Sequence, residues 1–342
     1  MEKEHYGAID GLRTVACIGI VLMHIAANNS YEISGFVYNA MIPSFTDFVF
    51  LFMTVSAFSM CCGYYRKIID NRISFSEFYG KRFKKILPFF SLLVLLDLAV
   101  SPSVGALYEA FADLTLMFGF LPNAGNINVI GVAWFLGLVF VFYIYFPFFC
   151  VLLQTRRRAW VTFVLSLAYN FVCTRYFNVD RSNILYCSCF FMAGGLLYLY
   201  RNELLRVNRW LGLGIAALSA FLYYFLGGNL VGKLLVSVSW PAYAVICAGD
   251  GSGRSLILEN KFTKFVSNIS MEIYLSHMVV FRAVEKLGLN RLFGSGWVQY
   301  IVTALVVLCG AAVFSAIMQK LIGNIIEKLE AARGSRGSAA CR

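Results

Sequence analysis

An arginine and a histidine stand eleven positions apart in an otherwise apolar segment near the N-terminus. Arg13 and His24 bound this stretch, and the residues between them carry no charge. Eleven residues make about three helical turns, so both side chains point to one face, about 16 Å apart along the axis. A cation and an imidazole on a membrane-embedded helix cost free energy unless they serve chemistry or find polar partners. An interfacial arginine and a hydrogen-bonded structural histidine are the alternative, and the shared face favours function.

The composition places this segment in a membrane. The 342-residue chain is 60% hydrophobic and 14% charged, with a mean hydropathy of +0.72, and a soluble chain of this kind could not cover its surface with polar groups. We predict an all-α polytopic membrane protein with about ten transmembrane helices. The expected spans are residues 12–27, 44–62, 86–101, 130–153, 159–177, 183–200, 210–226, 231–248, 265–285 and 297–318, with a further interfacial or re-entrant helix at 110–121.

The basic residues indicate the orientation, because Lys and Arg collect in cytoplasmic loops. Loops 28–43 and 102–129 contain neither residue type, whereas the loop between them is rich in both. With ten spans, both termini are therefore cytoplasmic. The net charge of +11 then reflects topology and attraction to anionic lipid, and no nucleic-acid partner is expected. The opposite side keeps only Arg175, Arg181, Lys233, Arg282, Lys286 and Arg291.

The chain is expected to form one membrane domain over residues 1–325, followed by a short basic cytoplasmic tail at 326–342. Most of the ten cysteines lie in predicted spans and none forms a CxxC pair, so we interpret them as small packing residues. Three histidines in separate segments, without a carboxylate cluster, argue against a bound metal.

Polar residues occur within the second span and directly before the third. Ser56 lies among small residues, for which close helix packing is the expected role and a hydroxyl facing the core is the alternative. Four cations occupy five positions over residues 81–85. They form either a topology determinant and lipid anchor or, since Arg82 and Lys85 share a helix face, a grip for phosphate oxygens.

The fourth and ninth spans carry the remaining candidates. Trp134 and Tyr143 belong to the fourth, where aromatic residues usually act as interface anchors. The ninth contains Glu272 and His277, whose five-residue spacing turns them onto different faces. We therefore expect no catalytic dyad there, and interpret His277 as a packed, hydrogen-bonded histidine.

In order along the chain, these segments resemble the acyltransferase-3 family of bacterial integral membrane acyltransferases over residues 5 to 320. Three positions depart from the family pattern, with Ala57 in place of Gly, Lys85 in place of Arg and Val139 in place of Glu. The similar segments are Asp10 to His24 for the Arg-x10-His signature, 50–58 for FF-x-x-SGF, 82–88 for RxxR-I-x-P, 134–147 for WSL-x-x-E-x-x-FY and 273–277 for YL-x-H.

The resemblance implies transfer of an acyl group, most often acetyl, from a cytoplasmic acyl-coenzyme A to a hydroxyl of a cell-envelope glycan or lipid-linked sugar precursor. The expected location is the bacterial cytoplasmic (inner) membrane, with membrane lipid and the glycan acceptor as partners and no metal. His24 acts either as general base or as a transient acyl carrier. The implied roles are catalytic for His24 and Arg13, donor binding for Lys81, Arg82 and Lys85, and substrate or structural support for Asp10, Ser56, Trp134, Tyr143 and His277.

Two other function classes stay open. A transporter or flippase of an envelope precursor would also suit ten spans with buried charge, although such transporters often show paired halves with Gly- or Pro-broken spans that this sequence lacks. A non-catalytic anchor or sensor would keep the fold without the chemistry, and the Arg13/His24 pair argues against it. We expect spans one, two, three, four and nine to surround one polar cavity, because polar groups must face a bundle interior or water.

Overall fold

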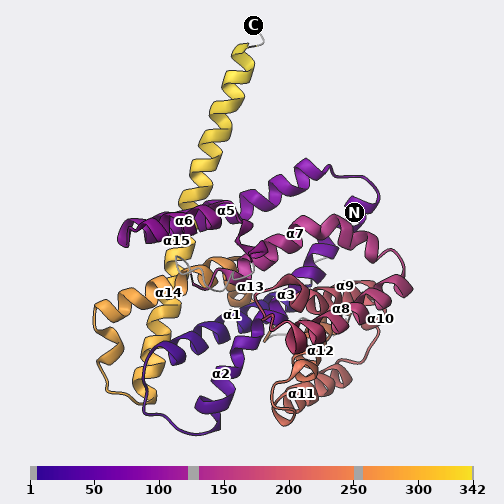
Figure 1. The fold of residues 1–342 in the computed structure, drawn as a ribbon, viewed down its shortest axis with the longest axis horizontal. Helices are drawn as coiled ribbons and strands as arrows, with labels where there is room; N and C mark the ends of the chain where they lie inside the picture. Colours follow the sequence, from indigo (N-terminus) through magenta and orange to yellow (C-terminus); the bar gives the residue numbers. More distant parts are fainter. Residues whose placement is uncertain (1–5, 122–130, 250–256, 341–342) are drawn as a thin grey trace.

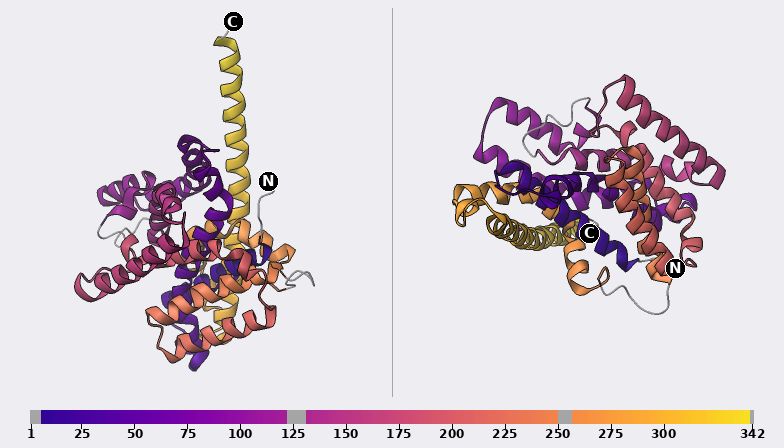
Figure 2. Two further views of the ribbon diagram at one scale, coloured as in Figure 1. Left: turned by 90° about the vertical axis from the view of Figure 1, so that its right-hand side faces the viewer. Right: turned by 90° about the horizontal axis from the view of Figure 1, so that it is seen from below.

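The computed structural model describes residues 6–121, 131–249 and 257–340, with side chains up to residue 328. Within these ranges the regular structure is helical throughout, and the helices form one bundle from which the C-terminal helix projects (Figures 1 and 2). The all-α prediction is therefore confirmed for the described residues.

A helix lies at each of the ten predicted spans. The long helices are α1 (Gly7–Asn28), α3 (Phe48–Met60), α5 (Phe75–Val100), α7 (Trp134–Leu152), α8 (Arg156–Tyr176), α9 (Ile184–Leu199), α11 (Arg209–Phe225), α12 (Leu230–Gly249), α14 (Ser270–Lys286) and α15 (Trp297–Ala340). The shorter segments are η1 (Val37–Met41), α2 (Ile42–Ser44), η2 (Phe45–Asp47), η3 (Cys61–Tyr65), α4 (Arg66–Ile69), α6 (Val104–Leu114), η4 (Met117–Phe120), α10 (Arg201–Leu204), α13 (Lys261–Asn268) and η6 (Leu289–Arg291).

Not all of these helices have the length and apolarity that crossing a membrane demands. Among the described residues, five segments meet both criteria. The count of ten spans and the cytoplasmic termini stay predictions. The five segments are Gly7–Asn28, Val37–Ile69, Trp134–Leu152, Leu230–Gly249 and Trp297–Lys328.

The expected ninth span is two helices and not one. The break falls at Ile269, whose φ of −113° and ψ of 13° lie outside the α-helical region. Polar side chains beside the break bond elsewhere: Ser270 Oγ donates to the Ser267 carbonyl at 2.9 Å, and Ser267 Oγ donates to Asp10 Oδ1 at 2.8 Å. Short hydroxyl side chains compete with the helical ladder in this way. The second bond also fixes α13 against the start of α1.

The second span packs closely on α9, as its small residues predict. Thr54 Oγ1 donates to the Phe190 carbonyl at 3.0 Å, and Gly194 of α9 lies so close to α3 that a Cβ there would stand 2.2 Å from the Thr54 carbonyl oxygen. Small residues allow this approach between helices in a membrane.

Gly194→Ala is expected to lower the free energy of unfolding by about 1–3 kcal/mol, since the added methyl group would meet backbone atoms that cannot rotate away. The matched control is Gly214→Ala in α11, where an added Cβ meets nothing within 4 Å. Thermal unfolding in one detergent compares the two variants. Equal stability would show that α3 and α9 can separate at no cost.

Candidate functional site

Arg13 lies in a cavity of about 620 Å³ that α1, α3, α5, α7, α9 and α13 enclose together with η3, α4 and Arg72. The guanidinium donates from Nη2 to Ser59 Oγ of α3 at 2.9 Å. The predicted site residues Asp10, Ser56 and Tyr143 also line this cavity. The expectation that spans one, two, three, four and nine surround a polar cavity therefore agrees with the arrangement around Arg13.

The cavity carries a strong excess of positive charge. Among the described residues, six cations and one carboxylate, Asp10, line its wall. Low-dielectric walls strengthen the field of such a cluster and draw in anions. The cations come from α1, α4, α5 and the turn between the last two: Arg13, Arg66, Lys67, Arg72, Arg82 and Lys85.

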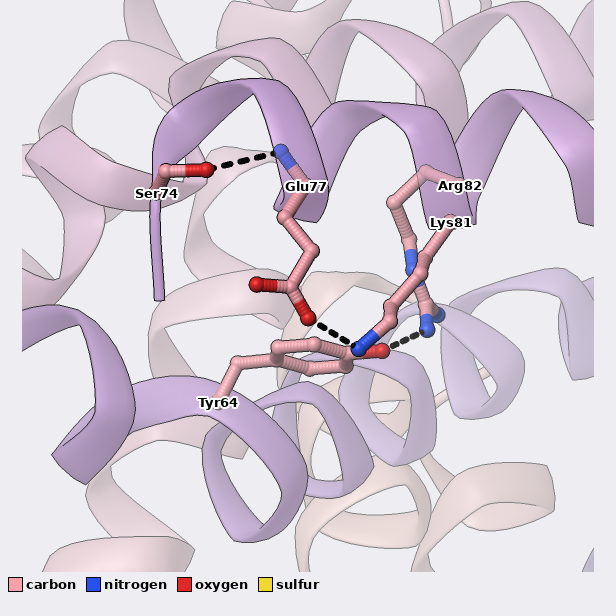
Figure 3. Close-up of polar contacts among 5 residues, drawn as sticks. All are labelled: Tyr64, Ser74, Glu77, Lys81 and Arg82. Carbon is pink, nitrogen blue, oxygen red and sulfur yellow. Dashed lines mark hydrogen bonds and ion pairs between the residues drawn. The ribbon is translucent and has the colours of Figure 1, made fainter. Parts of the chain in front are cut away.

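Neutral groups hold Arg82 at this wall, and Figure 3 shows one of them, the Tyr64 side chain. Its Cζ lies 4.6 Å from the centre of the Tyr64 ring, and Nη2 donates to the Tyr64 hydroxyl. Nη1 reaches Met60 Sδ at 3.4 Å, whereas the buried Nε has no hydrogen-bond partner. Within the described part of the chain, no carboxylate lies at ion-pair distance from this guanidinium. Its position is thus fixed while its charge stays available to a ligand.

Lys81 lies beside Arg82 but makes its polar contact with a carboxylate of its own helix. Its Nζ forms an ion pair with Glu77 Oε1 at 2.6 Å, one turn towards the start of α5, where Ser74 caps the helix (Figure 3). This hydrogen bond raises the pKa of Lys81 above its usual value. Lys81 is exposed and does not line the cavity. Two of the three predicted donor-binding residues therefore meet Arg13, and Lys81 does not.

His24 lies further along the same face of α1, outside the cavity lining. Cys17 and Ile20, which occupy this face between it and Arg13, are each 1% exposed, so packed side chains separate the two predicted catalytic residues. The expected single cavity therefore includes Arg13 and not His24.

The nearest aromatic neighbour of His24 comes from α14. The ring centres of His24 and His277 lie 5.1 Å apart with an angle of 44° between the planes. His277 is fully buried, with Nδ1 at 2.6 Å from the Tyr274 carbonyl oxygen, but its buried Nε2 has no partner. His277 is therefore packed and hydrogen-bonded through Nδ1, as expected, and the structure adds that its Nε2 is left without a partner.

Arg181 is a residue of this second site that the sequence did not single out. Its Nη1 donates to Thr46 Oγ1 at 2.7 Å, and its Cζ lies 5.2 Å from the centre of the Trp134 ring. It is close enough to His24 to interact with it electrostatically. The sequence did contain a signal for Arg181. It is one of the few basic residues on the predicted non-cytoplasmic side, where Lys and Arg are scarce.

The arrangement comprises a cationic cavity at one end of α1 and a half-buried imidazole with a nearby cation at the other. Such groups can bind a polyanion, accept a proton from a hydroxyl and bind a second substrate. In the described ranges, no group of three His, Cys, Asp or Glu residues is placed to hold a metal ion.

Comparison with known proteins adds one match. A family model for the acyltransferase-3 group, described as an acyltransferase domain, matches residues 6–316. No curated protein and no solved structure matches the chain.

Proposed function

The chain belongs to the acyltransferase-3 family and is a membrane acyltransferase, and we propose that it transfers an acyl group from cytoplasmic acyl-coenzyme A to a hydroxyl of a cell-envelope glycan or lipid-linked precursor. The acetyl group is the proposed cargo and the bacterial inner membrane the proposed location. The observation that carries this proposal is the cationic cavity at the start of α1, from which the same helix face leads to His24.

The cavity suits the polyanionic end of the donor. Coenzyme A carries a diphosphate and a further phosphate, and charge-assisted hydrogen bonds from Arg and Lys are the strongest protein contacts to such groups. Arg13, Arg82 and Lys85 approach the same space from two helices. His24 lies about 16 Å further along α1, so the thioester arm must pass along the face that Cys17 and Ile20 cover. On this proposal, these two side chains have to move when the donor binds.

His24 serves as the general base in this proposal. Its ring accepts the proton of the acceptor hydroxyl as the hydroxyl oxygen bonds to the thioester carbonyl carbon. The carbon–sulfur bond then breaks, and the coenzyme A thiolate leaves and takes up a proton. The separate positions of the cationic cavity and of Arg181 support direct transfer, because each substrate then has its own place on either side of His24.

Arg181 and Trp134 provide the acceptor side. A guanidinium anchored by Thr46 beside an aromatic ring presents both a charge and an apolar surface to a sugar or its carrier. Arg181 stands close to the base, Trp134 contacts Arg181, and neither residue lines the cavity of the donor cations.

Arg181→Gln is expected to raise the acceptor KM about ten- to a hundredfold, the equivalent of one charge-assisted contact, and to leave the donor KM unchanged. Arg175→Gln is the control, because Arg175 is exposed at the end of α8 on the same predicted side. Equal acceptor KM values for the two variants would remove Arg181 from the acceptor site.

The function itself is tested with purified protein in liposomes, supplied with acetyl-coenzyme A and with glycan or lipid-linked sugar acceptors. We expect release of the free thiol together with a gain of one acetyl mass on the acceptor. Movement of a labelled precursor across the membrane without thiol release would instead establish the transporter alternative.

A further inference from the structure

The hydrogen-bonding state of His277 follows from its surroundings. Nδ1 lies 2.6 Å from the Tyr274 carbonyl oxygen, and because a carbonyl only accepts, Nδ1 carries a proton. In the neutral ring, Nε2 is then an acceptor only. This lone pair is buried and has no partner in the described structure, and a buried acceptor left in this state is costly.

Polar neighbours of His277 on its own helix and on α1 are occupied elsewhere. The Tyr274 hydroxyl donates to the Val132 carbonyl at 2.8 Å, Ser276 Oγ shares a hydrogen bond with Ser315 Oγ, and Cys17 Sγ lies 3.5 Å from the Ser270 carbonyl oxygen. On these two helices, as the structure describes them, the His24 imidazole lies next to the His277 ring and has an N–H group that it can donate.

The spacing of the two rings fits such a bond. A ring nitrogen lies about 1.2 Å from its ring centre, and a hydrogen bond between nitrogens spans about 2.9 Å, so two imidazoles joined in line have centres about 5.3 Å apart. The observed separation is 5.1 Å. His24 is half-buried, whereas His277 is fixed by burial and its Nδ1 bond. At this separation, a rotation of the His24 ring can bring one of its nitrogens towards His277.

We propose that His277 is a positioning residue whose Nε2 accepts a hydrogen bond from one ring nitrogen of His24. The bond fixes the tautomer of His24 and directs its other, unprotonated nitrogen to the acceptor hydroxyl. This inference rests on the proposed role of His24 as base. His277 of α14 thus corresponds to the group that orients the base in other acyl-transfer sites.

The proton balance leaves His277 unchanged. The acceptor hydroxyl gives its proton to the free nitrogen of His24 as the oxygen–carbon bond forms and the carbon–sulfur bond breaks. His24 is then a cation that donates to Nε2 of His277, and a charged donor makes this bond stronger than in the resting state. His24 returns the proton to the departing thiolate, while His277 keeps its Nδ1 proton throughout.

The kinetic test compares His277→Leu with His277→Gln. Leu fills the space without an acceptor, and we expect kcat to fall about ten- to a hundredfold with the donor KM within about twofold of wild type. Gln places an amide oxygen near the position of Nε2 and should restore most of the rate. Ser276→Ala, at a buried neighbour on α14, controls for packing and should keep the wild-type kcat. Equal losses for Leu and Gln, or no loss with Leu, would overturn the positioning role.

A second test needs no activity. The chain has three histidines, so ¹⁵N-histidine labelling of the His5→Ala protein leaves two imidazoles to observe by NMR. We expect an unprotonated Nε2 on His277 and a single tautomer of His24 that becomes a mixture in His277→Leu. An unchanged His24 spectrum in that variant would refute the contact. Absence of thiol release by the wild type would instead refute the proposed function, with the spectra still reporting on the pair.

Discussion

His24→Ala is expected to lower the rate of acyl transfer by about 10²–10⁴-fold, the usual cost of losing a general base, while the protein still inserts and folds. The side chain is half-buried at the far end of α1, so its truncation leaves no large cavity. The donor KM should stay near the wild-type value, because His24 lies outside the cationic cavity. Thiol release and acceptor mass in liposomes measure the loss.

The matched control is Met23→Ala, at the adjacent position of α1, which is also half-buried. This variant changes the same turn of helix without touching the imidazole, and we expect it to keep most of the activity. Near-normal turnover by His24→Ala would refute the catalytic role. A comparable loss in both variants would assign the effect to the helix and not to the base.

Arg82→Ala is expected to raise the donor KM about ten- to a hundredfold and to change kcat little. The coenzyme phosphates make the same contacts in the ground state and the transition state, so the loss appears in binding. One charge-assisted contact is worth about 1.5–3 kcal/mol, which gives this range. Steady-state kinetics with acetyl-coenzyme A as the varied substrate measures the effect.

Lys81→Ala provides the control, because Lys81 stands one position earlier on α5 but pairs with Glu77 outside the cavity. If the cluster only sets topology, both variants keep the wild-type donor KM, since the remaining cations of the loop still fix its side of the membrane. Equal increases in both would indicate generic electrostatics. Lys85→Arg should keep or tighten donor binding, as a guanidinium can form two parallel bonds to phosphate.

The positions and faces of the helices could be predicted from the sequence because these properties depend on near neighbours. Long apolar runs predict helices in a membrane, and a helix lies at every expected span. The 3.6-residue period places Arg82 and Lys85 on one face, and both line the cavity. The break at Ile269 escaped prediction, and one of the hydrogen bonds beside it joins Ser267 to Asp10, a residue more than 250 positions away that a local pattern cannot take into account.

The tertiary structure alone decided which faces meet. The period of α1 gives Arg13 and His24 a common direction, but the packing of Cys17 and Ile20 between them encloses the arginine with the α5 cations and leaves the histidine outside. Likewise, the spacing within α14 predicts that His277 and Glu272 face different directions, but it does not predict that His277 meets His24. The centres of these two rings lie 5.1 Å apart, across the contact between α14 and α1. Periodicity is a local property of one helix. The rotation of one helix against another depends instead on close contacts such as that of Gly194 with Thr54. All neighbouring helices must satisfy their contacts at the same time.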